Sequence, residues 1–133
     1  MTISFDLVSP EKLLFNDEVG MIIVPGKDGD IGVLPKHSKL LSSLRPGRVL
    51  VYGEDKNLLK SFFVSGGFVE INPEKCIVLA EGVDEMGDID KNSIQKKIQE
   101  LENSSSDSDT AKQDLDILKS KITALESTYY QKI

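Results

Sequence analysis

The sequence predicts an α+β chain of two domains: an antiparallel β-sandwich over residues 1–87, followed by an antiparallel α-helical hairpin over residues 88–133. All ten glycines and all five prolines lie at or before Gly87, so the chain turns often up to that residue and hardly at all after it. Apolar residues alternate with polar ones in the first region and recur every three or four residues in the second.

The first strand is predicted from Ile3, Phe5 and Leu7, which alternate with polar residues and give one buried face. The pattern continues in short runs rich in β-branched and aromatic residues, at residues 13–15, 19–24, 31–34, 49–52, 58–64, 68–71 and 76–80. Roughly eight strands without room for crossover helices indicate an antiparallel sandwich or barrel.

Tight turns connect these strands. Residues 26–30 contain an Asp-Gly step between two apolar runs, which is a strong hairpin signal, and residues 54–57 and 72–75 are rich in turn formers. The glycine spacing at 26, 29 and 32 matches no phosphate-binding fingerprint, so we interpret it as part of the hairpin. Gly66 and Gly67 predict a bulge or corner.

The second region predicts two helices. The first begins near Asp88 or Asp90, which can cap it, and ends in a polar stretch at residues 103–108. The second begins at about Asp109 and has a length of about 23 residues. Their apolar seams consist of Ile94, Ile98 and Leu101 in the first helix, and of Ala111, Leu115, Leu118, Ile122, Leu125 and Tyr129 in the second. Such narrow seams predict a hairpin that depends on the sandwich or on another protein and can change partners.

Composition excludes several functions. The net charge of −6 and the pI near 4.8 argue against nucleic acid as a partner. No apolar run has the length of a membrane-spanning helix, and the first residues lack a targeting pattern, so we expect a soluble cytosolic protein without direct membrane insertion.

The sequence contains no group of residues that matches a catalytic or metal-binding site. His37 is the one histidine, so we expect no zinc site and interpret it as a surface or interface residue, while Cys76 lies in an apolar run and is expected to be buried. No set of nucleophile, base and orienting residue is present, and we expect no catalytic residue, cofactor or metal.

Three charged or polar features have structural interpretations. Acidic residues near the start of the first helix are typical of helix electrostatics rather than of a metal site: Asp84, Glu85, Asp88 and Asp90. The glycosylation sequon at Asn103 is interpreted as chance. Four lysines predict a solvated face of the second helix that could meet an acidic partner: Lys112, Lys119, Lys121 and Lys132.

Four phrases, at residues 8–11, 29–41, 45–47 and 63–70, closely resemble the epsilon subunit of bacterial and organellar F-type ATP synthases, in the expected order. The resemblance implies a non-catalytic rotor subunit at the foot of the central stalk. Its sandwich would contact the gamma subunit and rest on the ring of c subunits, and it would transmit torque generated by proton flow to the catalytic head.

The resemblance also implies roles for single residues. Asp30 and His37 match positions that face the c ring, and Ser42 falls where the family touches gamma. The resemblance further implies a peripheral location on the cytoplasmic face of the bacterial inner membrane, or on the equivalent face of an organelle membrane. The alternatives are a free-standing nucleotide-sensing module and a coiled-coil adaptor that self-associates through residues 109–129.

In the family, the helical hairpin folds against the sandwich or extends toward the catalytic head, where it restrains ATP hydrolysis. Some relatives bind ATP through a motif of Ile or Leu, Asp, two variable residues, Arg and Ala. Residues 89–94 match this motif, but Ser93 replaces the arginine and Ile94 the alanine. Because the bidentate cation that would hold phosphate is lost, we expect no ATP binding. The second helix has no arginine, and we expect weak or absent inhibition.

Overall fold

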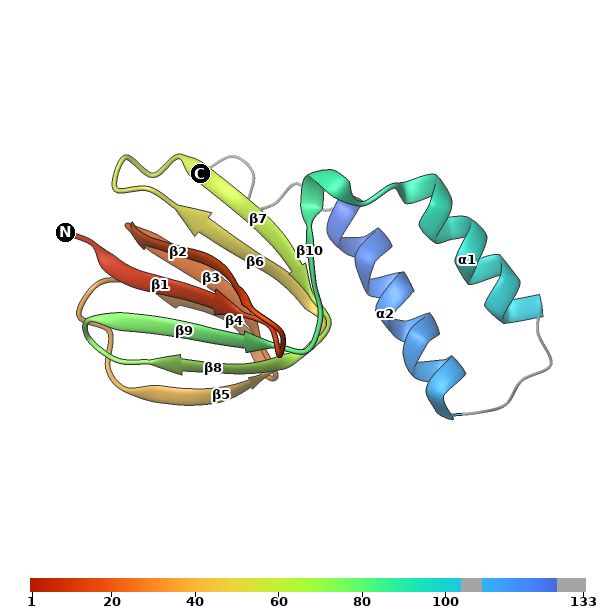
Figure 1. Ribbon diagram of the computed structural model, residues 1–133, viewed down its shortest axis with the longest axis horizontal. Coiled ribbons are helices and arrows are strands. Elements are labelled where there is room, and N and C mark those ends of the chain that lie inside the picture. Colours follow the sequence, from red (N-terminus) through yellow and green to blue (C-terminus); the bar gives the residue numbers. More distant parts are fainter. Residues whose placement is uncertain (104–108, 127–133) are drawn as a thin grey trace.

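The computed structural model describes residues 1–103 and 109–126, which form a β-sandwich followed by two helices (Figure 1). The strands of the sandwich are β1 (Ile3–Val8), β2 (Leu13–Val19), β3 (Met21–Gly26), β4 (Gly29–Val33), β5 (Leu40–Leu44), β6 (Gly47–Tyr52), β7 (Leu58–Val64), β8 (Gly67–Ile71), β9 (Lys75–Ala80) and β10 (Val83–Glu85). A 3₁₀ turn (Met86–Asp88) leads into α1 (Lys91–Asn103) and α2 (Asp109–Glu126). The predicted fold class is confirmed.

The strands follow the order β10-β7-β6-β3-β5-β8-β9-β1-β2, and β4 pairs with β3. Strands β3 and β5 pair only at Gly26 and Leu44, where the sheet passes from one layer of the sandwich to the other. The described pairings are antiparallel except for β1 with β9, which is parallel. This pair departs from the purely antiparallel prediction because β1 inserts between β2 and β9, and the long intervening chain permits either direction.

The core lies between the two layers and consists of residues that alternate along the strands. Ile3, Phe5 and Leu7 are fully buried, as the sequence pattern predicts. The ring of Phe15 lies 5.8 Å from that of Phe5 and 5.9 Å from that of Phe62, and so joins the two layers at the side where β2 approaches β7. The core cluster contains residues of the sandwich alone, from Ile3 to Ala80.

The turns agree with the prediction in most places. The hairpin at residues 26–30 forms with Gly26 opposite Gly29, and in the turn at residues 72–75 the side chain of Asn72 accepts hydrogen bonds from the amides of Glu74 and Lys75. Gly66 and Gly67 form the predicted corner, with φ angles of 128° and 136°. The predicted single run at residues 19–24 is wrong, because Gly20 separates β2 from β3 and a Cβ there would lie 2.5 Å from the carbonyl oxygen of Gly53.

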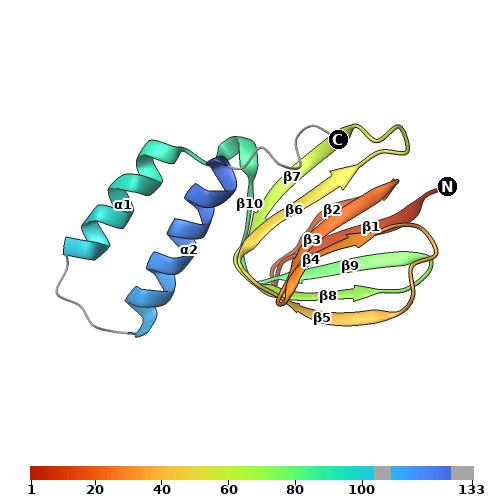
Figure 2. The same ribbon diagram turned by 180° about the vertical axis from the view of Figure 1, so that it is seen from behind.

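The helices begin as predicted. Asp90 caps α1: its carboxylate accepts hydrogen bonds from the amide of Asn92 (3.0 Å) and the hydroxyl of Ser93 (2.9 Å). Both views of the ribbon show α2 between α1 and the sandwich (Figure 2). The far end of the predicted second helix, with Tyr129, lies outside the described residues, as does the connecting stretch at residues 104–108. Along residues 1–103 and 109–126, no helix has the length and apolar character of a membrane span.

The single thiol gives a first test of the core. Cys76 is fully buried, and burial, followed by the charge of Asp6, raises the pKa of its thiol to about 12. A thiol with so high a pKa is almost entirely protonated at neutral pH and lacks the reactive thiolate form. We expect Ellman's reagent to leave the native chain unlabelled and to modify one thiol after addition of denaturant. Rapid labelling of the native chain would show that β9 does not lie in the core.

Candidate interaction surfaces

One outer face of the sandwich carries a row of exposed apolar side chains. On β8, Val69 and Ile71 face the core, so Phe68 points outward and is 53% exposed. Leu79 of β9 lies directly opposite Phe68 and is 51% exposed. Cross-strand neighbours at such positions are in side-chain contact range, so these two form one apolar surface.

The row continues on both sides. Val8 of β1 pairs with Leu79, and Leu13 of β2 pairs with Val8, while Leu41 of β5 lies diagonally across from Phe68. Leu13 and Leu41 are 55% and 71% exposed. We call this surface the apolar face and define it by Leu13, Leu41, Phe68 and Leu79. Contiguous exposed apolar side chains mark an interaction site, most often for another protein, a membrane or a ligand.

Ser42 lies beside the apolar face. It occupies the middle of β5, where it pairs with Val69 and is half-buried, because its side chain is on the inward side of the strand. Its hydroxyl donates to the carbonyl oxygen of Ser43 at 3.1 Å. The structure therefore places the predicted gamma contact one residue from the exposed Leu41, on the same strand.

Asp30 lies at the β3–β4 hairpin, at the end of the sandwich that holds Leu44 and Gly67. Its carboxylate forms an ion pair with Arg45 at 2.6 Å, and the same guanidinium donates to the carbonyl oxygen of Gly26 at 2.6 Å. Arg45 thus fixes the hairpin tip to the turn between β5 and β6. Asp30 is partly exposed there and remains accessible from solvent.

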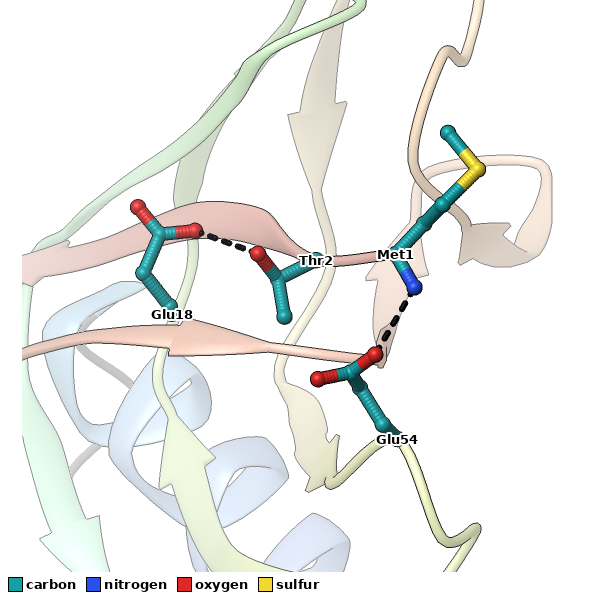
Figure 3. Close-up of polar contacts among 4 residues, drawn as sticks. All are labelled: Met1, Thr2, Glu18 and Glu54. Atoms are coloured by element: carbon teal, nitrogen blue, oxygen red, sulfur yellow. Dashed lines mark hydrogen bonds and ion pairs between the residues drawn. The ribbon is translucent and has the colours of Figure 1, made fainter.

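His37 lies at the opposite end of the sandwich from Asp30. The amide of Lys36 donates to the carbonyl oxygen of Pro73 in the β8–β9 turn, beyond the pair of Leu40 with Ile71. The length of β5 therefore separates the two residues, about 13 Å at 3.3 Å per residue. The same end of the molecule holds the amino group of Met1, 2.7 Å from the carboxylate of Glu54 (Figure 3). The structure does not bring Asp30 and His37 together.

The residues that match the nucleotide motif, at positions 89–94, have structural roles in this fold. Asp90 caps α1 through hydrogen bonds that include the hydroxyl of Ser93, and Ile94 is 7% exposed. The carboxylate that the motif would use is already engaged with the helix start. The side chain that stands in place of the alanine is buried.

Two lysines of α2 form ion pairs within the chain. Lys119 pairs with Glu102 of α1 at 3.4 Å, and Lys121 pairs with Asp84 of β10 at 2.8 Å. The interpretation of these lysines as a solvated face is therefore wrong for Lys121, whose side chain is only 19% exposed. Lys112 is exposed, and Lys132 lies outside the described residues.

The acidic cluster before α1 is divided among different partners. Asp84 binds Lys121, and Glu85 binds Lys60 at 2.6 Å. The side chain of Asp88 and the sequon at Asn103 lie outside the part of the chain that can be described. Among the described residues, no group of three or more His, Cys, Asp or Glu side chains has the arrangement of a metal site.

Comparisons with known proteins agree on one family. The family described as ATP synthase, Delta/Epsilon chain, beta-sandwich domain matches residues 2–85. The ATP synthase epsilon chain of Rhodospirillum rubrum is 41% identical over 98 residues, which cover 74% of this chain and 72% of that protein. The epsilon chain of Parvibaculum lavamentivorans is 41% identical over 96 residues, which cover 72% of each.

Solved structures share the fold. A chain of the Euglena gracilis mitochondrial ATP synthase, from an assembly of OSCP, F1 and c-ring, superimposes with a TM-score of 0.82 at 23% identity, over 94% of this chain and 82% of that one. A chain from the central stalk and c-ring of the Tetrahymena thermophila enzyme gives a TM-score of 0.62 at 18% identity, over 94% of each. From the match over its sandwich and the identity to its bacterial relatives, the chain belongs to the epsilon-chain family of the ATP synthases.

Proposed function

We propose that this chain is a non-catalytic rotor subunit in the central stalk of a proton-translocating F-type ATP synthase, where it couples rotation of the c ring to the catalytic head through the gamma subunit. Family membership supports the proposal, and the fold is shared with chains of ATP synthase assemblies. The observation that carries it is the apolar face, because a sandwich with exposed Phe68 and Leu79 needs a protein partner.

In this proposal the gamma subunit covers the apolar face, next to Ser42. Asp30 and His37 contact the c ring, and because they lie at opposite ends of the sandwich they do so as two separate contacts. The protein is then peripheral, on the cytoplasmic face of a bacterial inner membrane or on the equivalent face of an organelle membrane.

Copurification tests the proposal. We expect the intact, tagged chain to retain gamma and the c ring from solubilised membranes of its source cells. Absence of both, together with ATP affinity measured by calorimetry on the isolated chain, would favour a nucleotide-sensing module. Absence of both, together with self-association through residues 109–129 seen in sedimentation, would favour a coiled-coil adaptor.

We further propose that the hairpin is a mobile element and at most a weak brake on ATP hydrolysis. Lys119 and Lys121 are engaged by carboxylates of this chain. Residues 88–133 contain no arginine and carry 7 basic against 9 acidic residues. Little positive charge is therefore left to hold an acidic segment of the catalytic head.

Truncation after Gly87 tests this weak inhibition. We expect ATP hydrolysis by the purified complex to rise by less than about fivefold, the lower end of typical coupling between two sites. The core cluster lies within the sandwich, so the truncated chain should still copurify with gamma. A complex containing wild-type chain, purified in parallel, is the control. A larger rise in hydrolysis, with gamma still bound, would contradict weak inhibition.

A further inference from the structure

Phe63 is an outward-facing side chain that the protein nevertheless buries. Its neighbours on β7, Phe62 and Val64, belong to the core cluster, so alternation along the strand directs Phe63 to the outer surface. It is only 1% exposed. Helix α2 lies over this face, with the ammonium of Lys121 5.6 Å from the centre of the Phe63 ring. The burial of Phe63 therefore depends on the hairpin lying against the sandwich.

Lys121 contacts two neighbouring strands at once. Asp84 of β10 is the register partner of Phe63 on β7, and its carboxylate lies 2.8 Å from the same ammonium. A cation that lies over an aromatic ring and beside a carboxylate is stabilised by attraction to both groups. This contact joins a helix to the sandwich, whereas Lys60 with Glu85 joins two strands and Lys119 with Glu102 joins the two helices.

Helix α2 also buries a small side chain one turn after Lys121. Ala124, one turn after Lys121, is 7% exposed, and its side chain is a single methyl group, so its burial contributes little. The connection to the sandwich passes through Gly87, at which an added Cβ would meet nothing within 4 Å. Among the described residues, Lys121 therefore joins α2 to the sandwich beside the buried ring of Phe63, and loss of this contact is expected to loosen the hairpin.

We propose that Lys121, Phe63 and Asp84 form a salt-sensitive clamp that holds the helical hairpin on the outer face of β7 and β10. The Asp84 carboxylate is 48% exposed, so dissolved ions can compete for the contact. The clamp is a property of the isolated chain. Its consequence for the enzyme, the ease with which the hairpin leaves the sandwich, rests on the proposed function.

Pulsed EPR on the isolated full chain tests the clamp. Nitroxides at Glu70→Cys on β8 and Gln113→Cys on α2, both exposed positions, would report the distance between sandwich and hairpin. Cys76 is buried and should not interfere. We expect a narrow distribution at low salt that broadens as salt rises. Lys121→Gln should reduce the docking equilibrium by roughly three- to thirtyfold and remove most of the salt dependence.

Matched variants separate the clamp from general effects. Lys119→Gln removes a charge two residues away whose partner lies within the hairpin, and it should leave the distribution unchanged. The exchange of Lys121→Asp with Asp84→Lys should restore part of the docked population. Equal distributions for Lys121→Gln and Lys119→Gln would overturn the clamp. The outcome does not depend on gamma binding, so the clamp can fail while the proposed function stands.

Discussion

Replacing Gly67 with alanine is expected to cost about 4 kcal/mol of folding free energy, since a steric clash and a strained backbone each contribute roughly 1–3 kcal/mol. An added Cβ would lie 2.0 Å from the carbonyl oxygen of Leu79, a backbone atom that cannot move without breaking the β8–β9 pairing. The φ of 136° also belongs to a region that L side chains rarely adopt. Urea unfolding followed by circular dichroism measures the loss.

Two other glycines, one of them adjacent to Gly67, supply the controls for this change. Gly66 has a φ of 128°, but an added Cβ would meet its nearest atom at an ordinary 3.6 Å, so Gly66→Ala retains the strain and lacks the clash. Gly87→Ala meets nothing within 4 Å and should change stability by less than about 0.5 kcal/mol. Equal losses for Gly66→Ala and Gly67→Ala would show that the contact with Leu79 is not the cause.

The sequence predicts the strands that have a regular apolar pattern and misses those that do not. Strand β5 contains two serines, and β10 has only three residues, of which two are acidic, so neither gives a hydrophobic run. Tertiary pairing stabilises both: β5 pairs along its length with β8, and β10 pairs with β7. Such short strands depend on neighbours that are distant in the chain, which local patterns do not reveal.

The interaction surfaces were missed for a related reason, although a signal was present. Consecutive apolar residues occur at Phe62 and Phe63, at Phe68 and Val69, and at Val78 and Leu79. Since neighbouring side chains on a strand point to opposite faces, each pair indicates a strand covered on both sides. The sequence alone does not say which member faces the core. The register settles this and assigns Phe63 to the hairpin and Phe68 to the apolar face.

Substitution of Leu79 with aspartate is expected to abolish most of the binding to gamma. A carboxylate buried without a partner in an apolar interface costs about 2 kcal/mol or more, so we expect affinity to fall by at least about thirtyfold. Leu79 pairs with both Phe68 and Val8 and is therefore central to the apolar face. Because the side chain points away from the core, the variant should fold normally. Biolayer interferometry with immobilised gamma measures the affinity, and urea unfolding checks the fold.

The chain offers a closely matched control for the charge itself. Leu59 of β7 is 49% exposed, against 51% for Leu79, but it lies in the other layer of the sandwich, away from the apolar face. Leu59→Asp introduces the same carboxylate at the same degree of exposure and should bind gamma as the wild type does. If both variants lose binding equally, negative charge rather than position is responsible. If neither loses it, gamma binds elsewhere, and the exposed row from Leu41 to Leu13 needs a different partner.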